Sequence, residues 1–353
     1  MSYQEIKNCR FYVSILQYLK ALNKLEVWES TEGFLREKPL LSFLDINPSA
    51  RGVFESTGGT GQWGFTLSSK AGLYSELMPD NNNFFMVLGH EFKNVQCFLR
   101  RGETNEELAT TELINFGAKT PKNNGFSIGV GTSADGNTAQ IADLEQIKVV
   151  IGESGNLAEN TYDANTPYRL GSFLYGTYFE QRPNMSLKIS RNLGTISRQK
   201  SYNGSTFSNQ MNSKPPLWCN GLGAWQLDDG SNPIPHSLSR STRKVFDLKF
   251  TFNDSFDLFG PNQSLSSMNI TSDGYGSDVE DNEFKSNVLN DDNFMSTVWF
   301  KTLGPALPFV LQYNTDSNSP DNFVIARFMN NTLTMNQISH TVYEISVKIE
   351  EVY

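Results

Sequence analysis

The feature that most constrains the fold is a strict alternation of apolar and polar residues in two segments near the C-terminus. Residues 245–252 read VFDLKFTF, so Phe246, Leu248 and Phe250 share one face of an extended chain. Residues 342–350 read VYEISVKIE and alternate in the same way. Because successive side chains of a strand point to opposite faces, each segment predicts a β-strand with one buried face and one solvated face.

Most of the remaining chain also has the pattern of short strands. Apolar runs of strand length are separated by clusters of Gly, Asn, Asp and Ser, which are typical of turns. Charged residues make up 19% of the chain and aromatic residues 12%, a balance that favours β-structure. Trp63 and Trp299 fall in strand-like sequence, and we expect both in the core. The predicted strands lie at 62–67, 84–89, 95–100, 147–152, 309–313 and 323–328.

The N-terminal segment has a different period. Residues 11–25, FYVSILQYLKALNKL, predict a short strand that runs into one amphipathic helix. We therefore predict a mainly β protein with two β-sandwich or jelly-roll domains and one short N-terminal helix. The strand and helix occupy 1–39, the first β domain 40–178 and the second 179–353. A long acidic insertion is expected at about 253–293 within the second domain.

Charge, hydropathy and cysteine content argue against several classes of protein. The chain has 38 acidic and 29 basic residues and a net charge of −9, which disfavours binding to nucleic acid, although one local basic patch remains compatible with it. No apolar run approaches the roughly 20 residues of a membrane helix, and the N-terminus lacks a signal-peptide pattern, so we expect no membrane insertion. Cys9, Cys97 and Cys219 lie far apart, which predicts three free thiols.

The sequence offers little for catalysis. His90, His236 and His340 are its only imidazoles, and we interpret His90 as a turn residue in preference to a general base. The GxSxG and GxxxxGK[ST] patterns are absent, and we predict no enzyme, no catalytic residue and no cofactor.

Two groups of acidic residues invite other readings. Asp228 and Asp229 would have to lie close to a second carboxylate in a cleft to support glycoside cleavage. The acidic run at 273–283 has calcium-ligand chemistry but not the order of an EF-hand loop. We favour solvated loops for both groups and predict no metal site.

Two tryptophans are the best interface or ligand candidates. Trp218 and Trp225 lie in the segment PPLWCNGLGAWQLDDG at 215–230, which is rich in Pro and Gly. Exposed tryptophans stack on sugar rings or anchor protein interfaces. The alternative is that both are ordinary loop anchors tucked against a sheet.

Three stretches of the sequence resemble bacteriophage tail structural proteins. Residues 303–353 are similar to the C-terminal ends of marine phage virion proteins. Residues 84–102 resemble a strand and turn of discoidin-like, galactose-binding-like jelly rolls, with matches at Leu88, Gly89, His90 and Phe92. Residues 167–209 resemble the passage from that jelly roll to the next β domain, with matches at Leu170, Gly171, Tyr175, Gly176, Phe179, Pro183 and Asn184.

The resemblance implies a virion structural protein of the tail, of baseplate, distal-tail or fibre-adaptor type. Such a protein is made in the host cytoplasm and forms homo-oligomers and contacts with other tail proteins. The resemblance transfers no catalytic residue. The alternative function is a carbohydrate-binding module that contacts host surface glycans. A glycan hydrolase, the third hypothesis, would need two carboxylates close together in a cleft.

Overall fold

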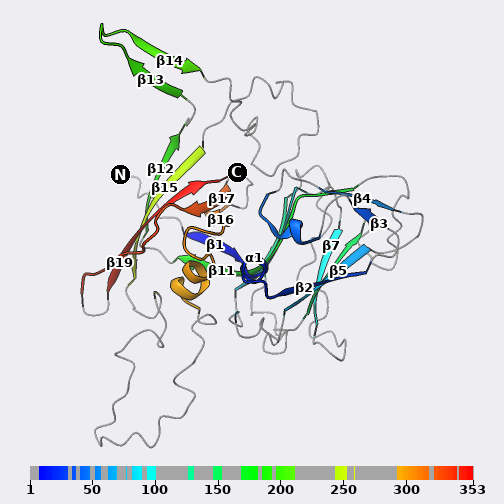
Figure 1. Ribbon diagram of the computed structural model, residues 1–353. Helices are drawn as coiled ribbons and strands as arrows, with labels where there is room; N and C mark the ends of the chain where they lie inside the picture. Colours follow the sequence, from blue (N-terminus) through cyan, green and yellow to red (C-terminus); the bar gives the residue numbers. More distant parts are fainter. Residues whose placement is uncertain are drawn as a thin grey trace, which may run out of the picture.

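The structure is a computed structural model, and it confirms that the chain is mainly β with few helices. Every strand pairing in the described part of the chain is antiparallel (Figure 1). The structure describes residues 8–30, 34–36, 40–47, 52–56, 63–69, 77, 82–89, 94–100, 126–130, 146–152, 168–181, 185–192, 196–210, 243–252, 258, 292–317, 322–339 and 342–352.

The predicted strand and helix at the N-terminus are confirmed. Strand β1 (Cys9–Ser14) leads directly into helix α1 (Ile15–Ala21). Ile15, Leu16 and Leu19 are fully buried, whereas Leu22 lies at the C-cap and is exposed. The helix is short because Asn23 adopts a left-handed conformation with φ 55°, which helical residues do not take.

A curled ten-stranded sheet is the main body of the molecule. β18 (Met335–Gln337) pairs with β19 beside the main path. The other nine strands follow in the order β12 (Met185–Asn192), β15 (Arg243–Phe252), β19 (Tyr343–Glu351), β17 (Phe323–Phe328), β16 (Phe309–Gln312), β1, β11 (Ser172–Gln181), β6 (Asn83–Leu88) and β8 (Phe126–Val130).

This sheet draws strands from all three segments of the predicted domain division. β1 comes from the N-terminal segment, and it lies between β16 near the C-terminus and β11. β11 itself extends across residue 178. The three segments are therefore joined by hydrogen-bonded strands in one sheet.

Three smaller sheets complete the architecture, together with the single-turn helix η1 (Leu40–Leu44). One contains β2 (Leu25–Ser30), β5 (Trp63–Ser69), β9 (Gln146–Gly152) and β7 (Asn94–Arg100). The second contains β10 (Tyr168–Leu170), β4 (Gly52–Ser56) and β3 (Phe34–Arg36). The third is the hairpin of β13 (Ile196–Lys200) and β14 (Thr206–Gln210).

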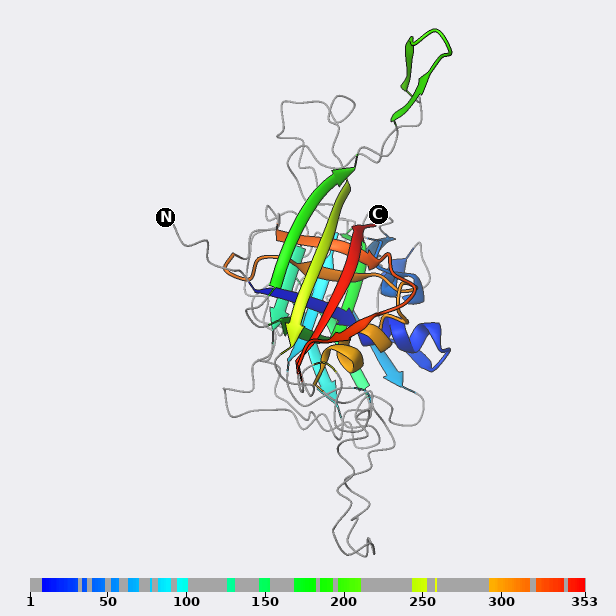
Figure 2. The ribbon, with the colours of Figure 1, turned by 90° about the vertical axis from the view of Figure 1, so that its left-hand side faces the viewer.

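Two hydrophobic clusters cover the two faces of β1. Figure 2 shows the long strands β12, β15 and β19 passing across β1, which encloses the larger cluster within the curl of the sheet. Phe11 is the centre of that cluster, with its ring 5.9 Å from Phe250 and 5.7 Å from Phe309. The smaller cluster lies on the opposite face, where Tyr12 packs 5.1 Å from Phe84.

The alternating segments form strands as predicted. In β19, Ile345, Val347 and Ile349 are buried and the residues between them are more exposed. In β15, the predicted apolar face is likewise buried at Phe246, Leu248 and Phe250. The period of two therefore reports accurately which face of each strand meets the core.

The interpretation of Trp299 as a strand residue was wrong. Trp299 lies in η9 (Met295–Phe300), a π-helix that packs its residues against the larger cluster. A short, continuous apolar run fits a buried helix as well as a buried strand, so periodicity did not separate the two. The side chain is partly buried, with its ring 5.3 Å from Phe328.

Candidate functional site

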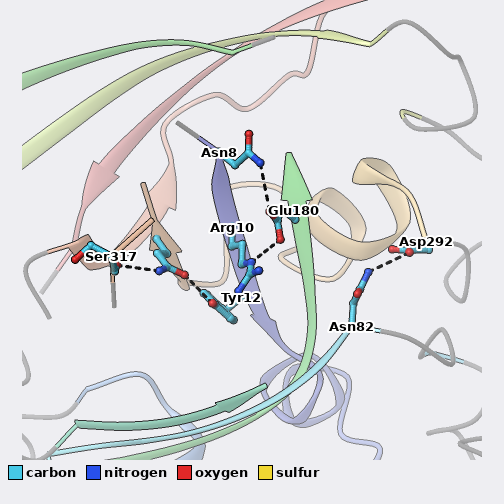
Figure 3. Close-up of polar contacts among 8 residues, drawn as sticks. Asn8, Arg10, Tyr12, Asn82, Glu180, Asp292 and Ser317 are labelled. Atoms are coloured by element: carbon cyan, nitrogen blue, oxygen red, sulfur yellow. Dashed lines mark hydrogen bonds and ion pairs between the residues drawn. The ribbon is translucent and has the colours of Figure 1, made fainter. Parts of the chain in front are cut away.

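Polar side chains form a cross-strand network on β1 and β11. Arg10 Nε donates to Glu180 Oε2 at 2.6 Å, and Asn8 Nδ2 donates to Glu180 Oε1 at 3.4 Å (Figure 3). The register places Arg10 opposite Glu180, and the guanidinium lies 5.0 Å from the centre of the Tyr178 ring. The pair fixes the register of two central strands, which is a structural task.

A second polar chain crosses the sheet from β1 to β16. The Tyr12 hydroxyl donates to Gln312 Oε1 at 2.8 Å, and Gln312 Nε2 donates to the Ser317 carbonyl at 3.2 Å (Figure 3). Burial raises the pKa of Tyr12 to about 12. Tyr12 is therefore a neutral hydrogen-bond donor at physiological pH.

Lys301 is the most unusual ionisable residue in the described part of the chain. It follows η9, is 1% exposed, and its Nζ lies 3.5 Å from Thr177 Oγ1 on β11. Burial lowers the pKa of Lys301 to about 7, against the opposing attraction of Asp292. Asp292 in turn accepts a hydrogen bond from Asn82 Nδ2 at 3.2 Å (Figure 3).

Two buried amide atoms lie on the elements that enclose Lys301. Asn83 precedes the apolar run of β6 and pairs with Thr177, while Asn293 lies two residues before η9 and accepts a hydrogen bond from Ser296 N through Oδ1 at 2.9 Å. Asn83 Oδ1 and Asn293 Nδ2 have no hydrogen-bond partner among the described residues. Lys301 is therefore buried within the fold, where the Thr177 hydroxyl is a polar partner of its amine.

A groove of about 660 Å³ opens beside helix α1. Its polar lining includes Lys20, which donates to Asp45 Oδ1 at 2.6 Å and to the Leu41 carbonyl at 2.8 Å. The Gln17 amide donates to the Pro308 carbonyl at 3.1 Å and accepts from Ile46 N at 3.2 Å. The remaining lining residues are Ala21, Ile46, Asn47, Leu307, Arg327 and Val352.

The hairpin of β13 and β14 stands away from the large sheet (Figures 1 and 2). We call residues 185–210, which comprise β12 and this hairpin, the arm. At its tip Ser201 N donates to the Ser205 carbonyl at 2.8 Å, and Gly204, with φ +79°, closes the turn. Tyr202 is fully exposed at this tip. Among the described strands, β13 and β14 pair only with each other.

The residues singled out from sequence for function fall largely outside the described part of the chain. Trp218 and Trp225 lie there, as do all three histidines, His90, His236 and His340. Asp228, Asp229 and the acidic run 273–283 also lie there, together with nearly all of the insertion at 253–293. Their predicted roles stay predictions.

One predicted thiol can be located. Cys9 is a free, buried cysteine in β1, as the sequence spacing led us to expect. Burial raises the pKa of the Cys9 thiol, which makes it unreactive.

Two features are absent from the described part of the chain. It contains no group of three or more His, Cys, Asp or Glu residues able to hold a metal ion. Within the same part of the chain, no helix is long and apolar enough to cross a membrane.

Sequence reasoning missed both Lys301 and the arm. Lys301 lies in the ordinary-looking segment STVWFKTLG, and nothing local to that segment reveals the strands that cover it. The arm carried a usable signal, since residues 185–210 contain four Lys or Arg residues and no Asp or Glu.

No protein-family model and no curated protein matches the sequence. The arm, the groove and the buried Lys301 are therefore interpreted from their own geometry. Of the three, the arm and the groove are open to a partner or ligand.

Proposed function

We propose that this protein is a structural subunit of a larger assembly and acts through protein–protein interfaces. The resemblance of its sequence to phage tail proteins makes that assembly a virion tail, with the chain in a baseplate, distal-tail or fibre-adaptor position. Within this proposal residues 40–178 form the galactose-binding-like jelly roll, and residues 179–353 form the second β domain.

The observation that carries the proposal is the arm. A two-stranded hairpin by itself is marginally stable in water, because it has no second layer against which to bury a face. The hairpin of β13 and β14 nevertheless stands apart from the large sheet, with Tyr202 fully exposed at its tip (Figure 1). An element of this kind gains stability when it docks on a partner, and tyrosine is among the residues that most often anchor interfaces.

The core supports the same function. The polar networks that join β1 to β11 and to β16 link side chains far apart in the sequence and fix strand register. A body held together by such networks, with a projecting arm, suits a structural subunit that binds neighbouring proteins in an assembly.

The experiment is to purify the virions of the phage whose genome carries this gene and to identify their proteins by mass spectrometry. We expect the chain among the tail proteins, and we expect virions that lack it to have incomplete tails by electron microscopy. Complete tails without the chain, together with its absence from wild-type virions, would overturn the proposal.

The groove beside α1 favours a second candidate function, the binding of host surface glycans. Its volume suits a small ligand, and Asp45, Asn47 and the exposed guanidinium of Arg327 offer the polar groups that bind sugar hydroxyls. The residues that line it include no aromatic side chain among those described, so sugar stacking would require Trp218 or Trp225.

A glycan array probed with the full chain tests this candidate. We expect a bound glycan to lose affinity in an Arg327→Ala variant and to keep it in Lys348→Ala, which removes an exposed cation on the neighbouring strand β19. An array without any binder contradicts the glycan function and leaves the assembly function intact.

A further inference from the structure

The ten-stranded sheet ends at β12, and no described strand pairs with the outer edge of this strand. β12 is paired with β15 along its whole length, from Met185 to Asn192, so it is a regular extended strand. Figure 2 shows it at the margin of the sheet, next to β15. Its outer edge therefore offers a row of backbone N–H and C=O groups to a further strand.

One apolar side chain is exposed at this edge. Ile189 is paired with Phe246 of β15, yet it is 44% exposed while Phe246 is fully buried. Leu187, two residues before it on the same face, packs against the larger hydrophobic cluster. We call this the inner face of the sheet. A strand that extends the sheet beyond β12 would cover Ile189 and continue the inner face.

The cations of β12 have carboxylates of the same chain near them. Lys188 lies directly opposite Asp247 in the ladder with β15. Burial raises the pKa of Glu351, and the nearby charges of Lys244 and Arg191 oppose that rise. The positive charge of the edge is thus partly compensated within one chain, which lowers the cost of bringing two such edges together.

We infer that β12 pairs with β12 of a second copy of this chain, in antiparallel orientation about a two-fold axis centred on Ile189. The inference rests on the proposed assembly function and names a partner for the root of the arm. A two-fold interface brings the same surface of both copies together, so each residue meets one that lies equally far on the other side of the centre. The two large sheets then form one continuous sheet.

On the inner face this register joins apolar groups. Paired residues of an antiparallel ladder point to the same face, so Ile189 meets Ile189 of the second copy. Leu187 meets Arg191 of the second copy, and the aliphatic part of the arginine covers the leucine. The exposed isoleucine of each copy is buried, and the inner face continues from one sheet to the next.

On the outer face the register avoids opposed like charges. Lys188 meets Ser190 of the second copy, and Ser186 meets Asn192. A register centred one residue earlier would set the two Lys188 side chains face to face, and like charges directly opposite each other destabilise a strand pair. The register centred on Ile189 pairs residues 186–192 of each copy without such a conflict.

The first test is sedimentation velocity of the full chain over a range of protein and salt concentrations. We expect a dimer that persists or tightens as salt is added. Each copy has a net charge of −9, and salt screens the repulsion between the copies.

Ile189→Lys replaces the central apolar pair by two opposed cations. We expect this variant to dimerise at least about tenfold more weakly than wild type. The matched control is Met329→Lys, because Met329 is also 44% exposed and follows β17, which β19 and β15 separate from β12. We expect the control to dimerise like wild type, and circular dichroism checks that both variants fold.

Two serine substitutions test the register through a gain of affinity, which unfolding cannot imitate. Ser186 and Ser190 are both exposed, and both lie two residues from Lys188 of their own chain. Only Ser190 meets Lys188 of the second copy in the inferred register. We therefore expect Ser190→Glu to dimerise at least about twofold more tightly than Ser186→Glu, because it adds two cross-strand ion pairs to each dimer.

Three outcomes would overturn the inference. The first is a wild-type chain that stays monomeric at every protein and salt concentration, which would mean that the cations protect the edge or that a strand of another protein fills it. The second is an Ile189→Lys variant that dimerises like Met329→Lys. The third is equal affinity of the Ser186→Glu and Ser190→Glu variants.

The proposed assembly function has a separate fate. A chain found in virion tails but monomeric in solution would contradict the β12 pairing and retain the structural subunit. A dimer with the expected response to these substitutions, formed by a chain that is absent from virions, would retain the pairing and contradict the tail function.

Discussion

The two halves of the large sheet are buried in different ways. β1 and β11 are covered on both faces, so nearly all of their residues are buried, including polar ones such as Ser172 and Thr177. β15 and β19 are covered on one face only, and their outer face carries charged residues such as Lys249 and Glu344. The difference shows where this fold tolerates change and where it does not.

Double coverage requires every polar group to find a partner inside the protein. Ser172 Oγ donates to the Asp45 carbonyl at 2.7 Å and accepts from Asn47 N at 2.9 Å. A polar residue on the outer face of β19 has water as a partner and needs no such arrangement. We therefore expect substitutions to cost far more in the first half than in the second.

The largest expected effect is the loss of a large side chain from the face of β1 that packs into the smaller hydrophobic cluster. Tyr12→Ala removes a ring packed among Phe84, Tyr178 and Phe323 and leaves Gln312 without its donor. We expect a loss of about 3–5 kcal/mol in the free energy of unfolding, measured by urea denaturation.

The matched substitution on the one-sided half is Lys348→Ala on the outward face of β19. We expect a change within about 0.5 kcal/mol, because this side chain is exposed. Equal effects of the two substitutions would remove the distinction between the halves.

The next effect arises at Gly176 on β11, which lies against the backbone of β1. A Cβ atom at Gly176 would lie 2.0 Å from the Val13 carbonyl oxygen and 2.8 Å from Ile15 N, both of them backbone atoms. Gly176→Ala therefore forces two central strands apart, and we expect a loss of about 3 kcal/mol.

Gly204→Ala in the tip of the arm is the control for this glycine. An added Cβ meets nothing within 4 Å there, and only the positive φ of +79° opposes it. We expect a loss of about 1 kcal/mol, and a larger loss at Gly204 than at Gly176 would contradict the close approach.

Lys301 makes the doubly covered half sensitive to pH. Its pKa is about 7 in the folded protein, where burial disfavours the charged form, against an ordinary value of 10.5. Between these values the unfolded chain holds the proton that the folded chain has lost, so stability rises with pH. We expect this lysine to add about 2 kcal/mol to the stability gained between about pH 7 and pH 9.

Lys301→Met isolates that contribution, because all other titrating groups are shared with wild type. Urea titrations across the same range should show a flatter pH dependence in the variant. Parallel curves for the two proteins would show that Lys301 does not lose its proton on folding.

The smallest expected effect is on the solvated face. Lys249 Nζ lies 2.8 Å from Glu344 Oε2, with the lysine side chain 53% exposed. We expect Lys249→Ala to cost at most about 0.5 kcal/mol and to cost less as salt is added. Exposed ion pairs contribute about 1 kcal/mol or less to stability. A measured cost of about 2 kcal/mol or more would therefore mean that a partner covers the outer face.

Local pattern was sufficient for much of the fold. The alternation of 245–252 and 342–350 predicted both the strands and their buried faces, because the period of two is a property of the extended backbone itself. The change of period at 11–25 likewise predicted β1 and α1. The apolar run around Trp299 failed as a predictor, since a buried π-helix and a buried strand have the same composition.

The sequence by itself thus determined the strands, the short helix and the acid excess, which depend on neighbouring residues and on simple counting. Only the tertiary structure decided that β1 lies between β11 and β16, that Lys301 is buried, and that the hairpin of β13 and β14 stands apart from the large sheet. The physical reason is sequence separation. The hydrogen bond from Tyr12 to Gln312 joins residues 300 positions apart, and no local pattern records such a contact.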